Sequence, residues 1–188
     1  MYEGLIVFED MRNYMESRRM TLSELAEASG LDAPRLARIR SGETLPTAGT
    51  VARICAALGC PVSAICELRG IEYRDEYKYK YKDREFVPPE DALGLPSYQP
   101  LRDFVYEFYK EREDKKTLSD LFDTIPKDEV PERLRGKAPR QYAGGKRIPG
   151  LVPRVRADIK ADRSVSMRVV YKICRKLRCS VDYVLTYR

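Results

Sequence analysis

The side chains with the clearest chemical potential in this 188-residue sequence are its positively charged ones. The chain has 35 lysines and arginines against 29 aspartates and glutamates, and residues 133–188 alone hold 16 basic and 3 acidic side chains. A field of one sign this dense attracts polyanions, above all the phosphates of nucleic acids. The alternative is a solvated basic surface that only aids solubility. We favour nucleic acid, because the excess falls where a DNA-facing element is also expected.

A second set of candidate side chains lies in the N-terminal third. Arg35, Arg38 and Arg40 fall on one short predicted helix. The inward face of that helix carries Leu36 and Ile39. A guanidinium group can donate two hydrogen bonds to a guanine edge and can also pair with phosphate. A helix that buries one face and presents arginines elsewhere is suited to docking on nucleic acid.

The sequence contains five cysteines and no histidine, which bears on metal binding and catalysis. The cysteines are Cys55, Cys60, Cys66, Cys174 and Cys179. The first two and the last two share a C-x4-C spacing, but a zinc site here would have to be all-thiolate, and this spacing matches the usual ligand pairs poorly. Each cysteine lies on an apolar phase of its segment, so we predict buried core thiols rather than metal ligands or disulfides. Without histidine, a phosphate-binding glycine motif or a recognisable acid pair, we expect no enzyme activity and no cofactor.

Residues 1–70 supply the elements that position the three arginines. A first helix is predicted at about 8–18. A capping box, Thr21–Glu24, opens the second helix, and Gly30 ends it, because glycine adopts the left-handed conformation at least cost. Asp32 caps the third helix, which carries the arginines.

Two more helices complete the N-terminal unit. Thr47 caps the fourth, and Val62 and Ile65 lie on a short fifth. The fourth has an apolar stripe at helical spacing, formed by Val51, Ile54, Cys55 and Leu58. A helix, a glycine turn and a second helix with exposed arginines form the geometry that lays one helix in the major groove.

These motifs resemble the lambda-repressor-like (Xre/Cro) family of helix-turn-helix domains. Leu25–Leu31 looks like the family's LAxxxG-hydrophobic signature. Ile39, Gly42 and Pro46 resemble its I-x-x-G-x-x-x-P continuation, and Ile54–Cys60 resembles its A-x-x-L-G-hydrophobic end. The resemblance covers residues 8–68, and the ordered set of signals is fairly specific.

The resemblance implies which positions face DNA. Where the family often has glutamine this chain has Leu22, and the two common base-reading positions fall on Ala33 and Pro34, which cannot form bidentate hydrogen bonds. Arg35 and Arg38 therefore remain the candidate base or phosphate contacts. Two further candidates lie at the edge of this surface: Arg40 and Thr44. The alternative is a five-helix domain used only for protein contacts.

The C-terminal end repeats elements of the N-terminal unit. The matching segments are Ile54–Val62 with Ile173–Val181, Thr21–Leu25 with Thr117–Leu121, and Pro34–Leu36 with Pro153–Val155. We predict a second, diverged helix-turn-helix domain at residues 101–188. The alternative is chance similarity between amphipathic helical segments.

The predicted second domain is interrupted by a basic insertion at about 126–150. Its prolines and glycines rule out one continuous helix. A basic segment beside a recognition helix can follow phosphates or enter a minor groove. The candidate DNA contacts of this half are Arg140, Lys146, Arg147, Arg154, Arg156, Lys160 and Arg163.

Residues 71–100 are predicted to be a linker. Tyr77, Tyr79 and Tyr81 alternate with lysines, a period-two pattern typical of an extended strand. We favour an edge strand that packs its tyrosines on a helical domain; the alternative is a tyrosine ladder that stacks on nucleic-acid bases. Four prolines mark the remainder as a connector: Pro88, Pro89, Pro96 and Pro100.

These patterns predict an all-α protein of two related five-helix helix-turn-helix domains joined by a linker with a short strand. The family resemblance implies a transcriptional regulator of prokaryotic or phage-like type. It would bind double-stranded DNA through the third helix of each domain and through the basic insertion. Homodimerisation through either domain stays open, as does RNA in place of DNA for the basic C-terminal half.

Two further expectations concern location and the rival class of function. No apolar run approaches the roughly eighteen residues needed to cross a bilayer, so we expect no membrane segment and a cytoplasmic location. The rival function is a protein-binding inhibitor or adaptor that reuses the helix-turn-helix scaffold, such as a phage-encoded factor acting on a nuclease or polymerase.

Overall fold

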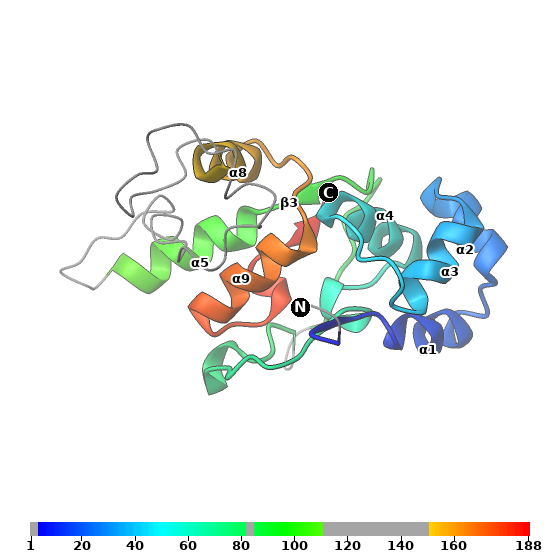
Figure 1. The fold of residues 1–188 in the computed structure, drawn as a ribbon, viewed down its shortest axis with the longest axis horizontal. Helices are drawn as coiled ribbons and strands as arrows, with labels where there is room; N and C mark the ends of the chain where they lie inside the picture. The colour runs from blue at the N-terminus through cyan, green and yellow to red at the C-terminus, as the bar shows by residue number, and fades with distance from the viewer. Residues whose placement is uncertain (1–3, 82–84, 111–150) are drawn as a thin grey trace, which may run out of the picture.

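The computed structural model describes residues 4–81, 85–110 and 151–188, and this part of the chain is mostly helical (Figure 1). The N-terminal elements are β1 (Ile6–Val7), α1 (Asp10–Ser17), α2 (Leu22–Ser29), α3 (Ala33–Arg40), α4 (Ala48–Leu58), the 3-10 helix η1 (Val62–Ala64) and β2 (Glu67–Leu68). β1 pairs antiparallel with β2, which joins the two ends of this unit. The predicted helices occur in the predicted order, and the short fifth one is a 3-10 helix.

Side-chain caps set the boundaries of these helices where the sequence predicts them. Thr21 and Glu24 form the capping box at the start of α2, and Gly30 ends that helix in the left-handed conformation, with φ 61°. The side chain of Asp32 accepts a hydrogen bond from the backbone N–H of Arg35 at 2.7 Å, which begins α3. Thr47 caps α4 in the same way. The turn between α2 and α3 is therefore determined by local sequence.

The C-terminal elements form a second unit. They are β3 (Pro96–Ser97), α5 (Gln99–Lys110), α8 (Leu151–Lys160), α9 (Met167–Leu177), the 3-10 helix η5 (Val181–Tyr183) and β4 (Thr186–Tyr187). β3 pairs antiparallel with β4, with Pro96 opposite Tyr187. Residues 111–150 lie outside the described residues, so the predicted second helix-turn-helix domain stays a prediction. The start of this unit, β3 and the first residues of α5, falls within the range 71–100 that we predicted as a linker.

The prediction of an all-α fold with one short strand in the linker is confirmed only in its mostly helical character, because two small antiparallel sheets are present in the described residues. Each strand is two residues long. A strand this short shows no alternating pattern, so an apolar segment such as Leu5–Phe8 could not be recognised as part of a sheet. Both sheets pair segments far apart in the sequence.

The predicted strand over the alternating tyrosines is also wrong. Residues 75–77 form a 3-10 helix, η2 (Asp75–Tyr77), and no strand follows it in the described residues up to 81. Tyr77 packs edge-on against Phe104 at 4.8 Å between ring centroids, and Tyr81 packs against Phe86 at 5.1 Å, whereas Tyr79 is exposed. The conformation of this segment therefore follows the aromatic contacts of Tyr77 and Tyr81, not the alternation of tyrosine and lysine in the sequence. The two packed tyrosines agree with the prediction that they contact the protein.

The N-terminal and C-terminal units share a continuous core. α4 packs against both β3 and β4, and the backbone N–H of Ala48 donates to the carbonyl of Val165 at 2.8 Å. The hydroxyl of Tyr171 donates to the carbonyl of Arg69 at 3.0 Å. The apolar stripe predicted for α4 is buried in this core, and so are the residues of α9 that match it: Val170, Ile173, Cys174 and Leu177. The two units are therefore packed together and not merely tethered.

Asp182 is a buried carboxylate at the contact between the units. Its Oδ1 accepts a hydrogen bond from the backbone N–H of Ser63 at 3.1 Å, and only 3% of its surface is exposed. The ammonium group of Lys80 donates to the backbone carbonyl of the same residue at 3.1 Å. Burial raises the pKa of Asp182, although the hydrogen bonds from Ser63 and the charge of Lys80 oppose that shift.

Replacing Asp182 should separate the role of its hydrogen bond from that of its charge. We expect Asp182→Ala to lower the free energy of unfolding by about 1–3 kcal/mol, because the Ser63 N–H loses the buried carboxyl group that accepts its hydrogen bond. Asp182→Asn keeps an acceptor and should cost less. Urea denaturation measures the free energy of unfolding of each variant. An equal loss of stability in Asp182→Asn and Asp182→Ala would contradict a role for this hydrogen bond.

The raised pKa of Asp182 also predicts that the stability of the protein depends on pH. The folded-state pKa of Asp182 is raised, so its contribution to stability is fully present below the ordinary aspartate pKa and is lost as the pH rises through the folded-state pKa. The stability of the parent chain relative to Asp182→Asn should therefore decline with rising pH and then level off. A difference that stays constant over this range would contradict the proposed titration.

Candidate nucleic-acid interface

α3 is backed by the core and open to solvent on its other side. Leu36 and Ile39 are fully buried, and α3 packs against α2, which in turn packs against α4. Pro34 and Arg38 are exposed, whereas Ala37 is partly buried between them. The helix can therefore approach a large partner along the face that carries these three residues.

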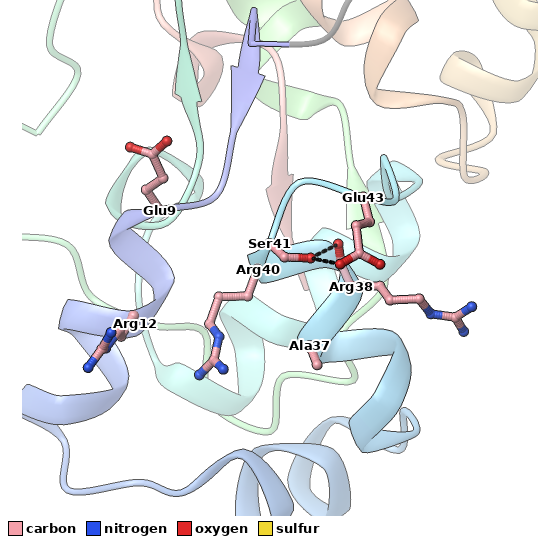
Figure 2. A pocket seen from close by; sticks show the side chains of 7 residues that line it. All are labelled: Glu9, Arg12, Ala37, Arg38, Arg40, Ser41 and Glu43. Atoms are coloured by element: carbon pink, nitrogen blue, oxygen red, sulfur yellow. Dashed lines mark hydrogen bonds between the residues drawn. The ribbon is translucent and has the colours of Figure 1, made fainter.

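Two of the predicted arginines project from opposite sides of this face. Figure 2 shows Arg40 extending on the same side as Arg12 of α1, whereas Arg38 points the other way. Arg12 and Arg40 line a hollow between α1 and α3, and they also line a second hollow at the start of α2, next to Thr21 and Leu22. Two guanidinium groups therefore flank the N-terminal end of α2.

The third predicted arginine, Arg35, contacts the protein itself. It is half-buried, and its Nη2 donates to Oγ1 of Thr50 at 3.3 Å. The hydroxyl of Thr50 also lies 3.1 Å from that of Thr47. Arg35 therefore links α3 to the first turn of α4, a role that its position on the predicted helix did not reveal.

Thr44, the fourth candidate in this domain, lies in the turn after α3. Its side chain is exposed, and its backbone N–H donates to the carbonyl of Arg38 at 3.1 Å. Ser41 donates to the same carbonyl and to the carboxylate of Glu43 (Figure 2). These hydrogen bonds hold the turn close to the C-terminal end of α3. Thr44 therefore stays next to Arg38 at the edge of the surface.

The acidic residues beside α2 and α3 limit where an anion can bind. Asp32 caps α3. Glu24 lies at the start of α2, where hydrogen bonds from the backbone N–H and the side chain of Thr21 lower the pKa of its carboxyl. An ionised carboxylate here satisfies the helix terminus and repels phosphate. Near the start of α2, the groups that could attract an anion are therefore the side chains of Arg12 and Arg40, not the backbone amides of the helix.

Arg12 was not among the sequence-derived candidates. The helical pattern placed it with Phe8, Met11 and Met15, on a mostly apolar face. In the structure it is exposed and forms an ion pair with Glu16 at 2.8 Å. Only the packing of α1 against the rest of the domain brings it near Arg40, and no local sequence signal could have predicted that.

Arg53 of α4 holds the turn that sets the angle between α2 and α3. Its Nε donates to the carbonyl of Ser29 at 2.8 Å, and its Nη2 donates to the carbonyl of Gly30. These carbonyls end α2, where a positive charge is favoured by the helix dipole. Arg53 is thus a structural residue of the helix-turn-helix unit that the sequence analysis did not single out.

The C-terminal candidates are only partly described. Lys160 at the end of α8 and Arg163 in the following turn are exposed, and Arg156 is half-buried. Nη1 of Arg163 lies 3.6 Å from Oδ1 of Asp158. Arg154 belongs to α8, but its side chain lies outside the described part, as do Arg140, Lys146 and Arg147 in full. The predicted cluster of basic contacts is therefore neither assembled nor excluded.

Asp162 anchors the turn after α8. Arg102 of α5 donates to both of its carboxylate oxygens, at 3.1 and 3.2 Å, and the backbone N–H of Tyr98 donates to Oδ1 at 2.8 Å. Burial works to raise the pKa of Asp162, but these hydrogen bonds and the charge of Arg102 outweigh it, so the pKa lies below its ordinary value. The carboxylate thereby ties the end of α8 to α5.

All five cysteines are buried, as predicted for core thiols. Burial raises the pKa of the Cys66 thiol well above its ordinary value, which keeps it protonated at neutral pH. Within residues 4–81, 85–110 and 151–188, no three histidine, cysteine or acidic side chains are placed to hold a metal ion.

The comparisons with known proteins agree with this geometry. Residues 10–69 match the family model of the Cro/C1-type helix-turn-helix DNA-binding domain. This segment, from α1 to the end of β2, is therefore a helix-turn-helix domain of the lambda-repressor-like type, as its motifs predict. A search of the curated proteins and a search of the solved structures each found no match to the chain. None of the described helices is both long enough and apolar enough to cross a membrane.

The different roles of Arg35 and Arg38 predict different effects on stability. We expect Arg35→Ala to lower the free energy of unfolding by about 0.5–1.5 kcal/mol, because the hydrogen bond to Thr50 is lost. Arg38→Ala should change it by less than about 0.5 kcal/mol, because that side chain is exposed. Denaturant unfolding of the two variants is the measurement, and equal effects would contradict the assignment of roles.

Proposed function

We propose that the protein is a DNA-binding transcriptional regulator whose N-terminal domain docks α3 on duplex DNA. The observation that carries this proposal is the solvent-facing side of α3 in a Cro/C1-type domain, with the guanidinium group of Arg38 projecting from it. Leu36 and Ile39 hold the opposite side of the helix in the core, so binding requires no unfolding.

The arginines divide between base recognition and phosphate binding. Arg38 is the candidate base contact, because a guanidinium group can bond both O6 and N7 of guanine. Arg40 and Arg12 are the candidate phosphate contacts, since they lie beside the start of α2. Pro34 and Ala37 offer only apolar contact, such as with a thymine methyl group. Sequence discrimination by this domain is thus limited to a few base pairs.

The C-terminal half is proposed to add phosphate contacts. Lys160 and Arg163 are exposed after α8, and the predicted insertion supplies Arg140, Lys146 and Arg147. Neutralising phosphates releases counterions, so binding that uses these side chains depends steeply on salt. The resemblance to the Cro/C1-type domain also suits a prokaryotic or phage regulator, and we propose that it acts in the cytoplasm.

One observation favours the second candidate function, a protein-binding adaptor or inhibitor. The first turn of α3, where base contacts are expected, holds Ala33 and the exposed Pro34 behind the acidic cap Asp32. These side chains suit a protein surface better than a base edge. The adaptor would bind no duplex, or would bind it without a steep dependence on salt.

The experiment that separates the two functions is a fluorescence-anisotropy titration with a random duplex and with the DNA upstream of the protein's own coding sequence, at two salt concentrations. A regulator should bind both, weaken at higher salt and prefer the upstream DNA. Absence of binding to either duplex at low salt would refute the proposal and direct attention to a protein partner.

Variants at Arg38 test the proposed base contact. We expect Arg38→Ala to weaken binding to the preferred duplex by about 10- to 100-fold, the effect of losing one bidentate contact, and to weaken binding to random duplex much less. Arg38→Lys is the matched control, because it keeps the charge but loses the planar fork. It should retain binding to random duplex and lose most of the preference. Unchanged preference in both variants would exclude Arg38 as a base contact.

A further inference from the structure

Part of the N-terminal unit recurs in the C-terminal unit at a constant interval. α4, η1 and β2 are followed 119 residues later by α9, η5 and β4, which have the same lengths. α4 and α9 begin after hydroxyl caps, Thr47 and Ser166, and both end at a residue in the left-handed conformation, Gly59 and Arg178. The non-glycine Arg178 adopting φ 57° indicates that the backbone of the turn is retained even where the residue type has changed.

Equivalent residues of the two units contact each other. Thr47 forms an antiparallel bridge with Ser166, its own counterpart at the interval of 119 residues. The backbone N–H of Ser63 donates to the side chain of Asp182, again its own counterpart, and η1 packs on η5. Residues meet their own equivalents only where a two-fold axis passes through a self-complementary interface. Two such contacts therefore define a local pseudo-two-fold axis within the chain.

From this geometry we infer that the chain is an internal pseudo-dimer that binds, as a monomer, a DNA site of two unlike half-sites. The inference rests on the proposed function and names the class of DNA that this site takes. The face of the N-terminal domain around Ala48 and Val62 is buried, and residues of the C-terminal unit contact it. A second chain cannot dimerise through that face, because the C-terminal unit of the same chain already covers it.

α8 occupies the place before α9 that α3 occupies before α4. Each helix immediately precedes the turn that leads to the bridge between Thr47 and Ser166, and Figure 1 shows α3 at the right of the view and α8 at its upper left. Two helices related in this way can face successive turns of one duplex, about 34 Å apart. α8 is therefore the counterpart of the helix that we propose docks on DNA.

Backbone hydrogen bonds establish which residues of α3 and α8 correspond. The N–H of Ser41 donates to Ala37 and that of Gly42 to Ile39, and in α8 Ala161 and Asp162 donate to Ala157 and Ile159. Gly42 and Asp162 both have positive φ, 80° and 51°. The interval is thus 120 residues here, and Glu43 is the extra residue of the first turn. The pairing of Pro34–Leu36 with Pro153–Val155 that the sequence suggested is wrong by one residue.

This correspondence places different chemistry on the two helices. Arg38 corresponds to Asp158, and Thr44 corresponds to Arg163, while Arg40 corresponds to another basic residue, Lys160. A carboxylate repels phosphate and accepts hydrogen bonds from the amino group of cytosine, whereas arginine favours guanine. The two halves therefore cannot prefer the same bases, and the favoured DNA site is not a palindrome.

The test is selection of preferred sites by the full chain from a pool of randomised duplexes, followed by native mass spectrometry of the selected complex. We expect a non-palindromic motif of two parts, centred roughly 10 base pairs apart, with one chain per duplex. A palindromic motif bound by two chains would overturn the inference while leaving the proposed function intact. A motif of one part only would do the same.

Variants assign the two parts of the motif to the two halves of the chain. Arg38→Ala should erase the preference in one part only, and Lys160→Ala combined with Arg163→Ala should weaken the other part only. If either variant weakened the base preference equally in both parts of the motif, the two halves of the chain would not have separate half-sites. Circular dichroism of each variant confirms that the fold is intact.

The oligomeric state of the protein without DNA is a second, independent test. Sedimentation velocity should show a monomer over a wide concentration range, because the axis is occupied within the chain. A concentration-dependent dimer would overturn the pseudo-dimer. If no duplex is selected at all, the proposed function and the unlike half-sites both fail, and sedimentation alone decides whether the internal pairing stands.

Discussion

The hydrogen bond from the Ser63 N–H to the buried carboxylate of Asp182 is the interaction on which the arrangement of the two units depends. A carboxylate taken out of water is costly unless polar partners surround it. Here the hydrogen-bond donor is the Ser63 N–H of η1, and the positive charge of Lys80 also favours the ionised form, so the group is tolerated only when η5 lies against η1. The bridge between Thr47 and Ser166 sets a second point of contact. Together these contacts hold the start of α4 against the start of α9, and with them the turns that follow α3 and α8.

The arginines of the N-terminal domain differ in what they contact, although three of them lie on the same helix, α3. Arg53 binds the carbonyls that end α2, and Arg35 binds the first turn of α4, so the start of α3 is held close to both helices. Arg38 is exposed and Arg40 partly so, and we propose that they contact DNA. A guanidinium group suits both tasks, because its several donors can satisfy carbonyl and hydroxyl oxygens inside the protein or phosphate and base oxygens outside it. Which task each arginine performs follows from what lies within reach of its side chain.

Local features of the fold could be predicted because their causes are local. The capping box at Thr21, the left-handed turn at Gly30 and the buried stripe of α4 each depend on residues within one or two helical turns. The two-residue strands were missed because their hydrogen bonds join residues about 60 and 90 positions apart. The tyrosines near 77–81 were misread because their contacts with Phe104 and Phe86 outweighed their alternation with lysine.

The sequence by itself determined the helix boundaries of the N-terminal domain, its helix-turn-helix type and the burial of its cysteines. Caps, glycine turns and apolar periodicity act over a few residues, so they can be read without knowing how the helices pack together. Only the tertiary structure decided that Arg35 braces α4 while Arg38 faces solvent, that Arg12 joins Arg40, and that Thr47 meets Ser166. The physical reason is that these contacts join residues 15 to 119 positions apart, and whether two such side chains meet depends on how whole helices pack.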